Sequence, residues 1–355
     1  LHSSDVVEAV PIGQFPDSRV FNAVAVADDG TVWVGSPDRG VAVRGTDGAW
    51  RRFVADEDEP ELGPQRAQLA DIATLPNGLV WVAHGRTNFG PVVSVYDPST
   101  GAWSGIAAAG PGEAGGGAPR TSQVMALAVE TSGGGTFAVW CATWNRGVYR
   151  YDASSDSWTE YNERDTRVAG DATSGLCDDT VWAIAEREGR VWAACAESSG
   201  DQGRGVSHWD ATTDRWHTLR TSAGLPTNIV TAIALGEGGA AYLGTDEPKN
   251  LTRGSVGVVP VRLADGELTI GEALRTAGPR PFVNEITALA FDGLGRLWAG
   301  TRQAGVMRFD PQSGTWTQFT RDSTGGRLTG DAVTDLAIVD DEVWVASTHE
   351  RFEGG

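Results

Sequence analysis

The chain has no long apolar segment. No stretch of it approaches the ~18 consecutive apolar residues that a membrane-spanning helix needs. No secretory signal peptide is visible at its start. We therefore expect no direct insertion of this chain into a membrane.

Basic charge is also scarce. The 355 residues carry a net charge of −19, and the 28 basic residues include a single lysine, Lys249. A surface this negative repels a phosphate backbone, so we do not expect nucleic acid as a partner. The preference for arginine is typical of a GC-rich genome, and it weakens any argument built on one arginine.

Cysteine is rare, with 3 residues: Cys141, Cys177 and Cys195. Their spacing fits no metal site, so no metal is expected from them. Cys177 lies just before a strand that is expected to pair with the strand of Cys195, which makes a disulfide conceivable. We expect instead three buried free thiols, because a free cysteine behaves as a small apolar side chain.

Catalytic motifs are nearly missing. The sequence has no G-x-S-x-G elbow, no P-loop and no H-E-x-x-H. The match to G-x-G-x-x-G at 110–115 lies in a glycine-rich segment without the strand and helix that a nucleotide site requires. We expect no cofactor, and an enzyme is not the favoured interpretation.

A short repeated phrase is what the chain does have. It occurs six times around a tryptophan, and a seventh copy has tyrosine in its place. The copies are TVWVGS (31–36), LVWVAH (79–84), AVWCAT (138–143), RVWAAC (190–195), AAYLGT (240–245), RLWAGT (296–301) and EVWVAS (342–347). Repeats at this spacing are typical of β-propellers, with one four-stranded blade for each repeat.

Each repeat predicts the same order of strands. A strand of alternating small and branched residues, such as ITALAF (286–291), precedes a turn rich in Asp and Gly and then the tryptophan strand. A third strand such as GVMRFD (305–310) ends in the hairpin phrase DPQSGTW, whose Trp316 begins an outer strand.

We predict an all-β, seven-bladed propeller with mostly four-stranded antiparallel blades, forming a single domain over 1–355. The blades are expected at approximately 21–54, 69–106, 124–161, 179–219, 229–271, 286–319 and 333–355. The seventh is short of strands, and we expect residues 5–13 to complete it as an outer strand. It would still be one strand short, so we favour the chain being part of a longer polypeptide over a three-stranded blade.

Eleven of the 14 tryptophans occupy two repeating positions, which indicates packing between blades. The others are Trp144, Trp182 and Trp209. Trp182 and Trp209 fall in expected strands and are predicted to be core residues. Trp144 falls in a loop, where its ring could stack on a sugar ring.

The repeat resembles the two-component-regulator propeller repeat, in FDGLGRLWAGTRQAGVMRFDPQSGTWTQF (291–319) and in AEREGRVWAACAE (185–197). The resemblance covers residues ~21–347 and implies a bacterial sensor propeller outside the cytoplasm, either periplasmic or extracellular. It further implies binding of a small molecule, often an oligosaccharide, ahead of a transmembrane signal.

Candidate ligand-binding residues lie in the loops after the tryptophan strands, on one face of the propeller. Every such loop contains an arginine, and together these could form a cationic rim for a carboxylated or sulfated ligand. The candidates are Arg39, Arg86, Arg146, Arg204, Arg253, Arg302, Trp144 and His84. Ion pairing with acidic loops remains the favoured alternative for the arginines.

Three functions remain open. The favoured one is a sensor that binds a small molecule or oligosaccharide at the mouth of a central channel, and the next is a scaffold that binds a protein partner. The third is a propeller lyase or hydrolase acting on a polysaccharide or antibiotic. The enzyme requires His84 or His349 near a carboxylate or metal.

Overall fold

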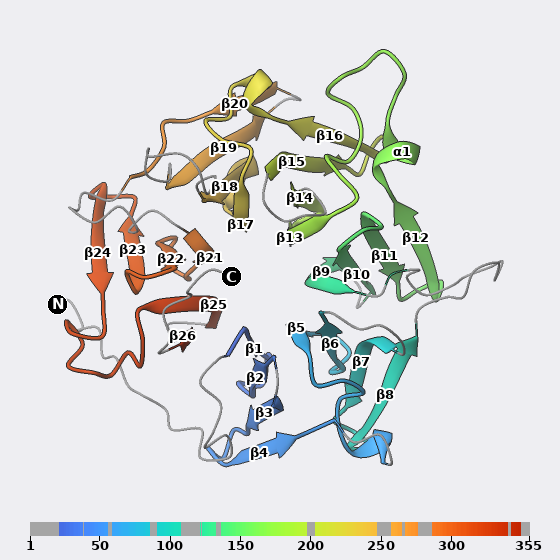
Figure 1. The fold of residues 1–355 in the computed structure, drawn as a ribbon, viewed down its shortest axis with the longest axis vertical. Helices are drawn as coiled ribbons and strands as arrows, with labels where there is room; N and C mark the ends of the chain where they lie inside the picture. Colours follow the sequence, from blue (N-terminus) through green and yellow to red (C-terminus); the bar gives the residue numbers. More distant parts are fainter. Residues whose placement is uncertain are drawn as a thin grey trace.

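The computed structural model describes residues 21–37, 39–55, 59–85, 91–107, 121, 123–132, 136–196, 203–246, 257–264, 267–275, 286–339 and 342–348. They form an all-β propeller in which strands radiate from a central axis (Figure 1). The predicted fold class is confirmed in this respect.

Six sheets of four antiparallel strands follow one another along the chain, and we call them blades 1 to 6. Blades 1 to 3 consist of β1 (Ala23–Val26), β2 (Val32–Ser36), β3 (Gly40–Arg44) and β4 (Trp50–Phe53); β5 (Leu69–Thr74), β6 (Val80–His84), β7 (Pro91–Asp97) and β8 (Ala102–Ala107); and β9 (Val124–Ser132), β10 (Thr136–Thr143), β11 (Val148–Asp152) and β12 (Ser157–Tyr161).

Blades 4 to 6 consist of β13 (Val181–Arg187), β14 (Arg190–Ala196), β15 (Gly203–Asp210) and β16 (Arg215–Leu219); β17 (Val230–Leu235), β18 (Ala240–Thr245), β19 (Val258–Ala264) and β20 (Glu267–Ile270); and β21 (Ile286–Phe291), β22 (Leu297–Thr301), β23 (Val306–Asp310) and β24 (Thr315–Phe319). Single helical turns lie between strands: η1 (Pro60–Leu62), α1 (Glu163–Thr166), η2 (Thr221–Ala223) and η3 (Glu237–Gly239).

A two-stranded sheet, which we call the closing sheet, contains β25 (Ala332–Val339) and β26 (Glu342–Thr348). It lies between blade 6 and blade 1 (Figure 1). The hydroxyl of Thr287 donates to the carbonyl of Val333 at 2.7 Å on one side, and Thr334 donates to the carbonyl of Phe21 on the other. Residues 5–13, predicted to complete this sheet, lie outside the described residues.

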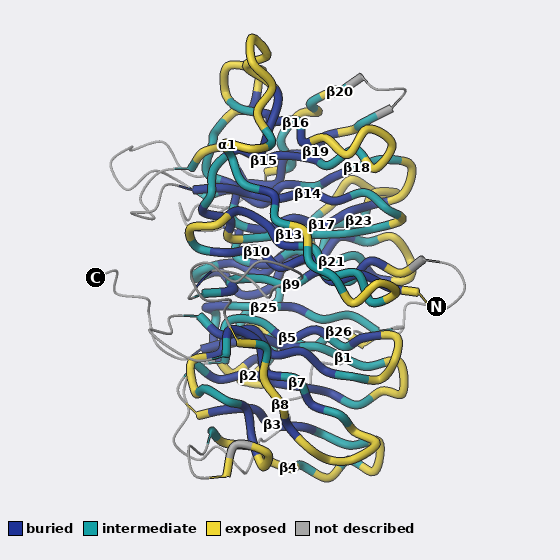
Figure 2. Tube along the Cα trace, turned by 90° about the vertical axis from the view of Figure 1, so that its right-hand side faces the viewer, coloured by how far each residue is buried: buried dark blue, intermediate teal, exposed yellow. Residues whose placement is uncertain are grey.

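The hairpins form because their turns carry residues suited to the required backbone. At the first hairpin, the Asp29 carboxylate accepts the backbone N–H of Thr31 at 2.8 Å, and Gly30 has a φ of +85°. Glycine tolerates this left-handed conformation without a Cβ clash. Figure 2 shows the result, with exposed turns at the strand ends and buried strand segments between them.

The repeating tryptophans form the core between neighbouring blades, as predicted. Trp140 of β10 is fully buried beside Tyr161, Trp209 and Trp216, so it joins blade 3 to blade 4. Its indole N–H donates to Glu130 at 2.9 Å, and this bond satisfies a polar group that burial would otherwise penalise. The core assignment of Trp209 is consistent with this packing.

The cysteine prediction was wrong for two of the three residues. Cys177 and Cys195 form a disulfide with their Cα atoms 5.8 Å apart, while Cys141 is free and buried. Cys177 belongs to the connection that leads back to the inner strand of blade 4. That connection brings Cys177 beside β14, so the pairing that the sequence left conceivable but did not favour is the one that forms.

No helix among the described residues is long and apolar enough to span a membrane.

Candidate functional site

One face of the propeller holds the ends at which each inner strand begins and each second strand finishes. We call it the upper face, and we call the first residues of the inner strands its inner rim. The predicted ligand-binding loops all belong to this face. Arg86 and Arg253 lie outside the described residues, as does His349.

Two predicted arginines form ion pairs. Arg302 Nη2 lies 2.6 Å from Asp246 Oδ2, and Arg204 Nε lies 3.6 Å from Asp178 Oδ2. Their charges are compensated by acids of the same face, which agrees with the alternative interpretation, while the cationic rim stays a prediction. Arg39 is exposed at the turn before β3.

Arg146 remains available as a contact residue. It is exposed in the loop between β10 and β11, and its guanidinium forms no ion pair within the described part of the chain. Its backbone N–H donates to Thr143 Oγ1 at 3.1 Å, which fixes the loop but leaves the side chain exposed.

His84 is not a surface residue. It ends β6 with 0% exposure, and its Nε2 lies 2.7 Å from the Ser94 hydroxyl. Burial lowers the pKa of His84 to about 4, so its ring is neutral at pH 7. The prediction that it contacts a ligand on this face is therefore corrected, because its ring faces the interior of blade 2.

An aromatic pair is the most distinctive feature of the upper face. Trp144 is half-buried in the loop between β10 and β11, as predicted for a loop residue. Its ring centroid lies 5.4 Å from that of Trp182, with the ring planes tilted by 57°. Trp182 is 37% exposed, so its prediction as a core residue was wrong.

The prediction from sequence missed Trp182 as a candidate binding residue, although an alignment of the repeats could have found it. Trp182 lies three residues before Ala185, and Ala185 pairs with Trp192, which is the tryptophan of the repeated phrase in blade 4. In blades 1, 5 and 6 and in the closing sheet, the same position holds a hydrogen-bonding side chain, and the residues are Asn22, Thr231, Thr287 and Thr334.

These polar side chains bridge neighbouring inner strands at the inner rim. Asn22 donates to the carbonyl of Leu69, and Thr231 donates to that of Ile286 at 2.5 Å. A tryptophan cannot repeat this short bond, because its one donor sits at the edge of a large ring. At this position blade 4 presents an exposed aromatic surface in place of the bridging side chain of blades 1, 5 and 6.

Two carboxylates add a further bridge at the inner rim. Asp71 of β5 accepts the backbone N–H of Leu127 at 2.7 Å, and Asp335 of β25 accepts that of Val24 at 2.8 Å. Burial raises the pKa of Asp71 to about 6 and that of Asp335 to about 8. An alignment of the repeats could have found these two acids, because the other five copies have alanine at the same position.

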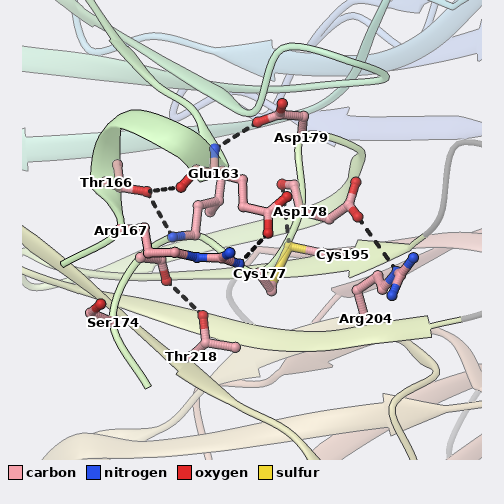
Figure 3. Close-up of polar contacts among 12 residues, drawn as sticks. Glu163, Thr166, Arg167, Ser174, Cys177, Asp178, Asp179, Cys195, Arg204 and Thr218 are labelled. Atoms are coloured by element: carbon pink, nitrogen blue, oxygen red, sulfur yellow. Dashed lines mark hydrogen bonds and ion pairs between the residues drawn. A yellow bond between two sulfur atoms is a disulfide. The ribbon is translucent and has the colours of Figure 1, made fainter. Parts of the chain in front are cut away.

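The connection between blades 3 and 4, which leads to Trp182, is densely bonded (Figure 3). There the Asp179 carboxylate accepts the backbone N–H of Glu163 at 2.6 Å, and the disulfide joins Cys177 to Cys195 beside the Asp178–Arg204 pair. Within the described residues, no three His, Cys, Asp or Glu side chains are grouped so as to hold a metal ion.

Comparison with known proteins gives the fold. No protein-family model matches the chain, and no curated protein matches it. Among solved structures, the extracellular domain of a hybrid two-component system from B. thetaiotaomicron is 15% identical with a TM-score of 0.70. A second such domain from the same organism is 15% identical with a TM-score of 0.63.

The coverage of these matches is unequal. The alignments span 97% and 96% of this chain but only 40% and 38% of those two domains. Virginiamycin B lyase from Staphylococcus aureus is 14% identical with a TM-score of 0.59, over 94% of this chain and 93% of the lyase. The chain therefore shares the β-propeller of sensor-type extracellular domains and also that of an enzyme.

Proposed function

We propose that this chain is a ligand-binding sensor propeller whose site is the Trp144–Trp182 pair on the upper face. The observation that carries the proposal is the exposure of Trp182 at a rim position where other blades have a bridging side chain. An exposed indole beside a second indole presents an apolar surface suited to a planar or saccharide ring.

The polar surroundings of the pair suit the same class of ligand. Asn145 and Arg146 are exposed next to Trp144 in the loop between β10 and β11. An amide and a guanidinium can donate to hydroxyl, carboxylate or sulfate oxygens while the ring stacks. The ligand is accordingly a small molecule or an oligosaccharide, bound at the mouth of the central channel.

The proposed location is extracytoplasmic. The sensor-type neighbours are extracellular domains, and the Cys177–Cys195 disulfide is of a kind that persists in oxidising compartments. In keeping with the greater length of those domains, we propose that signalling depends on sequence beyond this chain. We also propose that residues 5–13 complete the closing sheet as a seventh blade.

The two other functions have weaker support. A lyase shares the fold. However, His84, the upper-face histidine that the structure describes, is buried, and its pKa is lowered. For a scaffold, the exposed large apolar residues of the described part of the chain do not gather in one place. Val54 and Leu62 flank blade 1, Val168 follows α1, Trp182 begins blade 4, and Leu294 occupies a hairpin of blade 6.

A thermal-shift screen against neutral and acidic oligosaccharides tests the proposal. A ligand at a hundred times its Kd stabilises the folded state by about 2.7 kcal/mol. The unfolding entropy of a chain this long is about 0.7 kcal/mol/K, so the expected rise in Tm is about 4 °C. Trp144→Ala and Trp182→Ala should each abolish the rise.

Leu294→Ala is the matched control, because Leu294 is an exposed apolar residue on a hairpin at the opposite ends of the strands. It should leave the shift intact. A shift that survives both tryptophan substitutions would place the ligand elsewhere and refute this site. Turnover of an oligosaccharide in the same screen would favour the enzyme instead.

A further inference from the structure

Within the described residues, the two junctions of blade 4, with blade 3 and with blade 5, differ from the others at the inner rim. Side chains of the inner strands bridge blades 1 and 2, 2 and 3, 5 and 6, blade 6 and the closing sheet, and the closing sheet and blade 1. Among the described residues, no such rim bridge joins β13 of blade 4 to either neighbour.

A repeated backbone tie is present at this junction and at others. The N–H of Gly147 donates to the carbonyl of Asp179 at 2.7 Å. The N–H of Gly205 donates likewise to Asn228 at 3.0 Å, and that of Gly305 to Asp331 at 2.8 Å. This tie positions the connection between blades wherever it occurs, so it does not by itself explain the aromatic pair.

The residue after the tie is where blade 4 departs from the pattern. Ile229 and Ala332 follow Asn228 and Asp331, and neither side chain can donate a hydrogen bond. Thr180 follows Asp179, is 1% exposed, and donates its hydroxyl to the carbonyl of Trp144. The hydroxyl thus joins the backbone of one tryptophan to the chain two residues before the other.

The disulfide is the second addition at this junction. Val181 pairs with Cys195 across β13 and β14, while Cys177, four residues before Val181, is bonded to the same Cys195. The arc from Asp178 to Thr180 is therefore attached to β14 at both of its ends. Figure 3 shows the disulfide next to Asp178.

We propose that Thr180 and the Cys177–Cys195 disulfide are positioning residues for the Trp144–Trp182 pair. Residues 178–180, attached to β14 at both ends, hold Trp182 through the backbone and Trp144 through the Thr180 hydroxyl. The two rings are then held 5.4 Å apart before any ligand arrives. Such preorganisation reduces the entropy lost on binding, and this consequence for affinity rests on the proposed function.

Conservative changes of Thr180 provide the test. Thr180→Val removes the hydroxyl, and the fold tolerates apolar residues here, since Ile229 and Ala332 occupy the equivalent positions. Thr180→Ser keeps the hydroxyl but loses a buried methyl group, which lowers stability. A purely structural role predicts that Ser is the worse substitution, whereas a positioning role predicts that Val is.

The readout is ¹⁹F NMR of protein labelled with 5-fluorotryptophan, with Trp144→Phe and Trp182→Phe used to assign the two resonances. We expect Thr180→Val and the Cys177→Ala/Cys195→Ala double variant to shift or broaden both resonances. Thr180→Ser should restore them. Ala332→Val, at the equivalent position before β25, should leave them unmoved. Unchanged resonances in Thr180→Val would overturn the inference.

Ligand binding is measured separately, with any oligosaccharide that shifts the melting temperature in the screen. Loss of one hydrogen bond should weaken binding about 2- to 10-fold in Thr180→Val, with Thr180→Ser close to wild type. If the resonances move but no oligosaccharide binds, the positioning inference stands and the proposed function fails. If both variants bind equally, the link between preorganisation and affinity is refuted.

Discussion

Removing the disulfide gives the sharpest prediction for stability. The two cysteines are 18 residues apart in sequence, and closing a loop of that size removes about 3 kcal/mol of chain entropy from the unfolded state at 25 °C. The Cys177→Ala/Cys195→Ala double variant should therefore unfold about 3 kcal/mol more easily. Its melting temperature should fall by about 4 °C, given the unfolding entropy of a chain of 355 residues.

Urea unfolding followed by tryptophan fluorescence measures this difference, with equal m-values showing that the same surface is exposed. Wild-type protein reduced with dithiothreitol should match the double variant. Cys141→Ala is the control for loss of a buried thiol without a cross-link, because Cys141 is free and buried. A double variant within 1 kcal/mol of wild type would refute the argument.

Three further outcomes follow from buried groups. Trp140→Phe should cost about 2–4 kcal/mol by urea unfolding, because it opens a cavity and removes the bond to Glu130; a loss under 1 kcal/mol would contradict the packing. Gly147→Ala should be more destabilising than Gly78→Ala in thermal melts, since a Cβ at Gly147 would lie 2.1 Å from a carbonyl oxygen and one at Gly78 meets nothing. Both have positive φ, so equal losses would show that crowding has no part. Burial raises the pKa of Asp335 to about 8, above its unfolded value, so its stabilising contribution is complete in acid and is lost as pH rises through about 8. Comparing wild type with Asp335→Asn at pH 5 and pH 8 should show the steeper fall in wild type, and parallel curves would contradict it.

The repeats in the sequence were enough to predict the propeller. The repeated tryptophans and the Asp and Gly turns make their contacts within one blade or with the next blade. Each copy of the repeat therefore predicts the same local structure. The loop position of Trp144 followed from the same alignment, because Trp144 lies outside the two positions at which tryptophan repeats.

The rest depended on contacts between distant segments. His84 seemed to belong to a loop, yet β6 extends to include it and buries it against Ser94. Trp182 stood inside an expected strand, and only the folded structure shows that its ring is exposed beside Trp144. The disulfide required knowing where the connection between two blades runs, which hydrophobic periodicity does not specify.

The distribution of rim bridges has a consequence for how the ring comes apart. Chain ends are ordinarily where a fold frays first. Here the closing sheet, where the ring joins, is bridged on both sides by Thr287, Thr334 and Asp335. Among the residues that the structure describes, the inner strand with no rim bridge is β13, which lies in the middle of the sequence. Its junction with blade 3 is held instead by the Thr180 hydroxyl, and the disulfide attaches the connection before β13 to β14. We therefore expect that reduction of the disulfide favours local opening at blade 4, in the middle of the chain, over opening at the closing sheet.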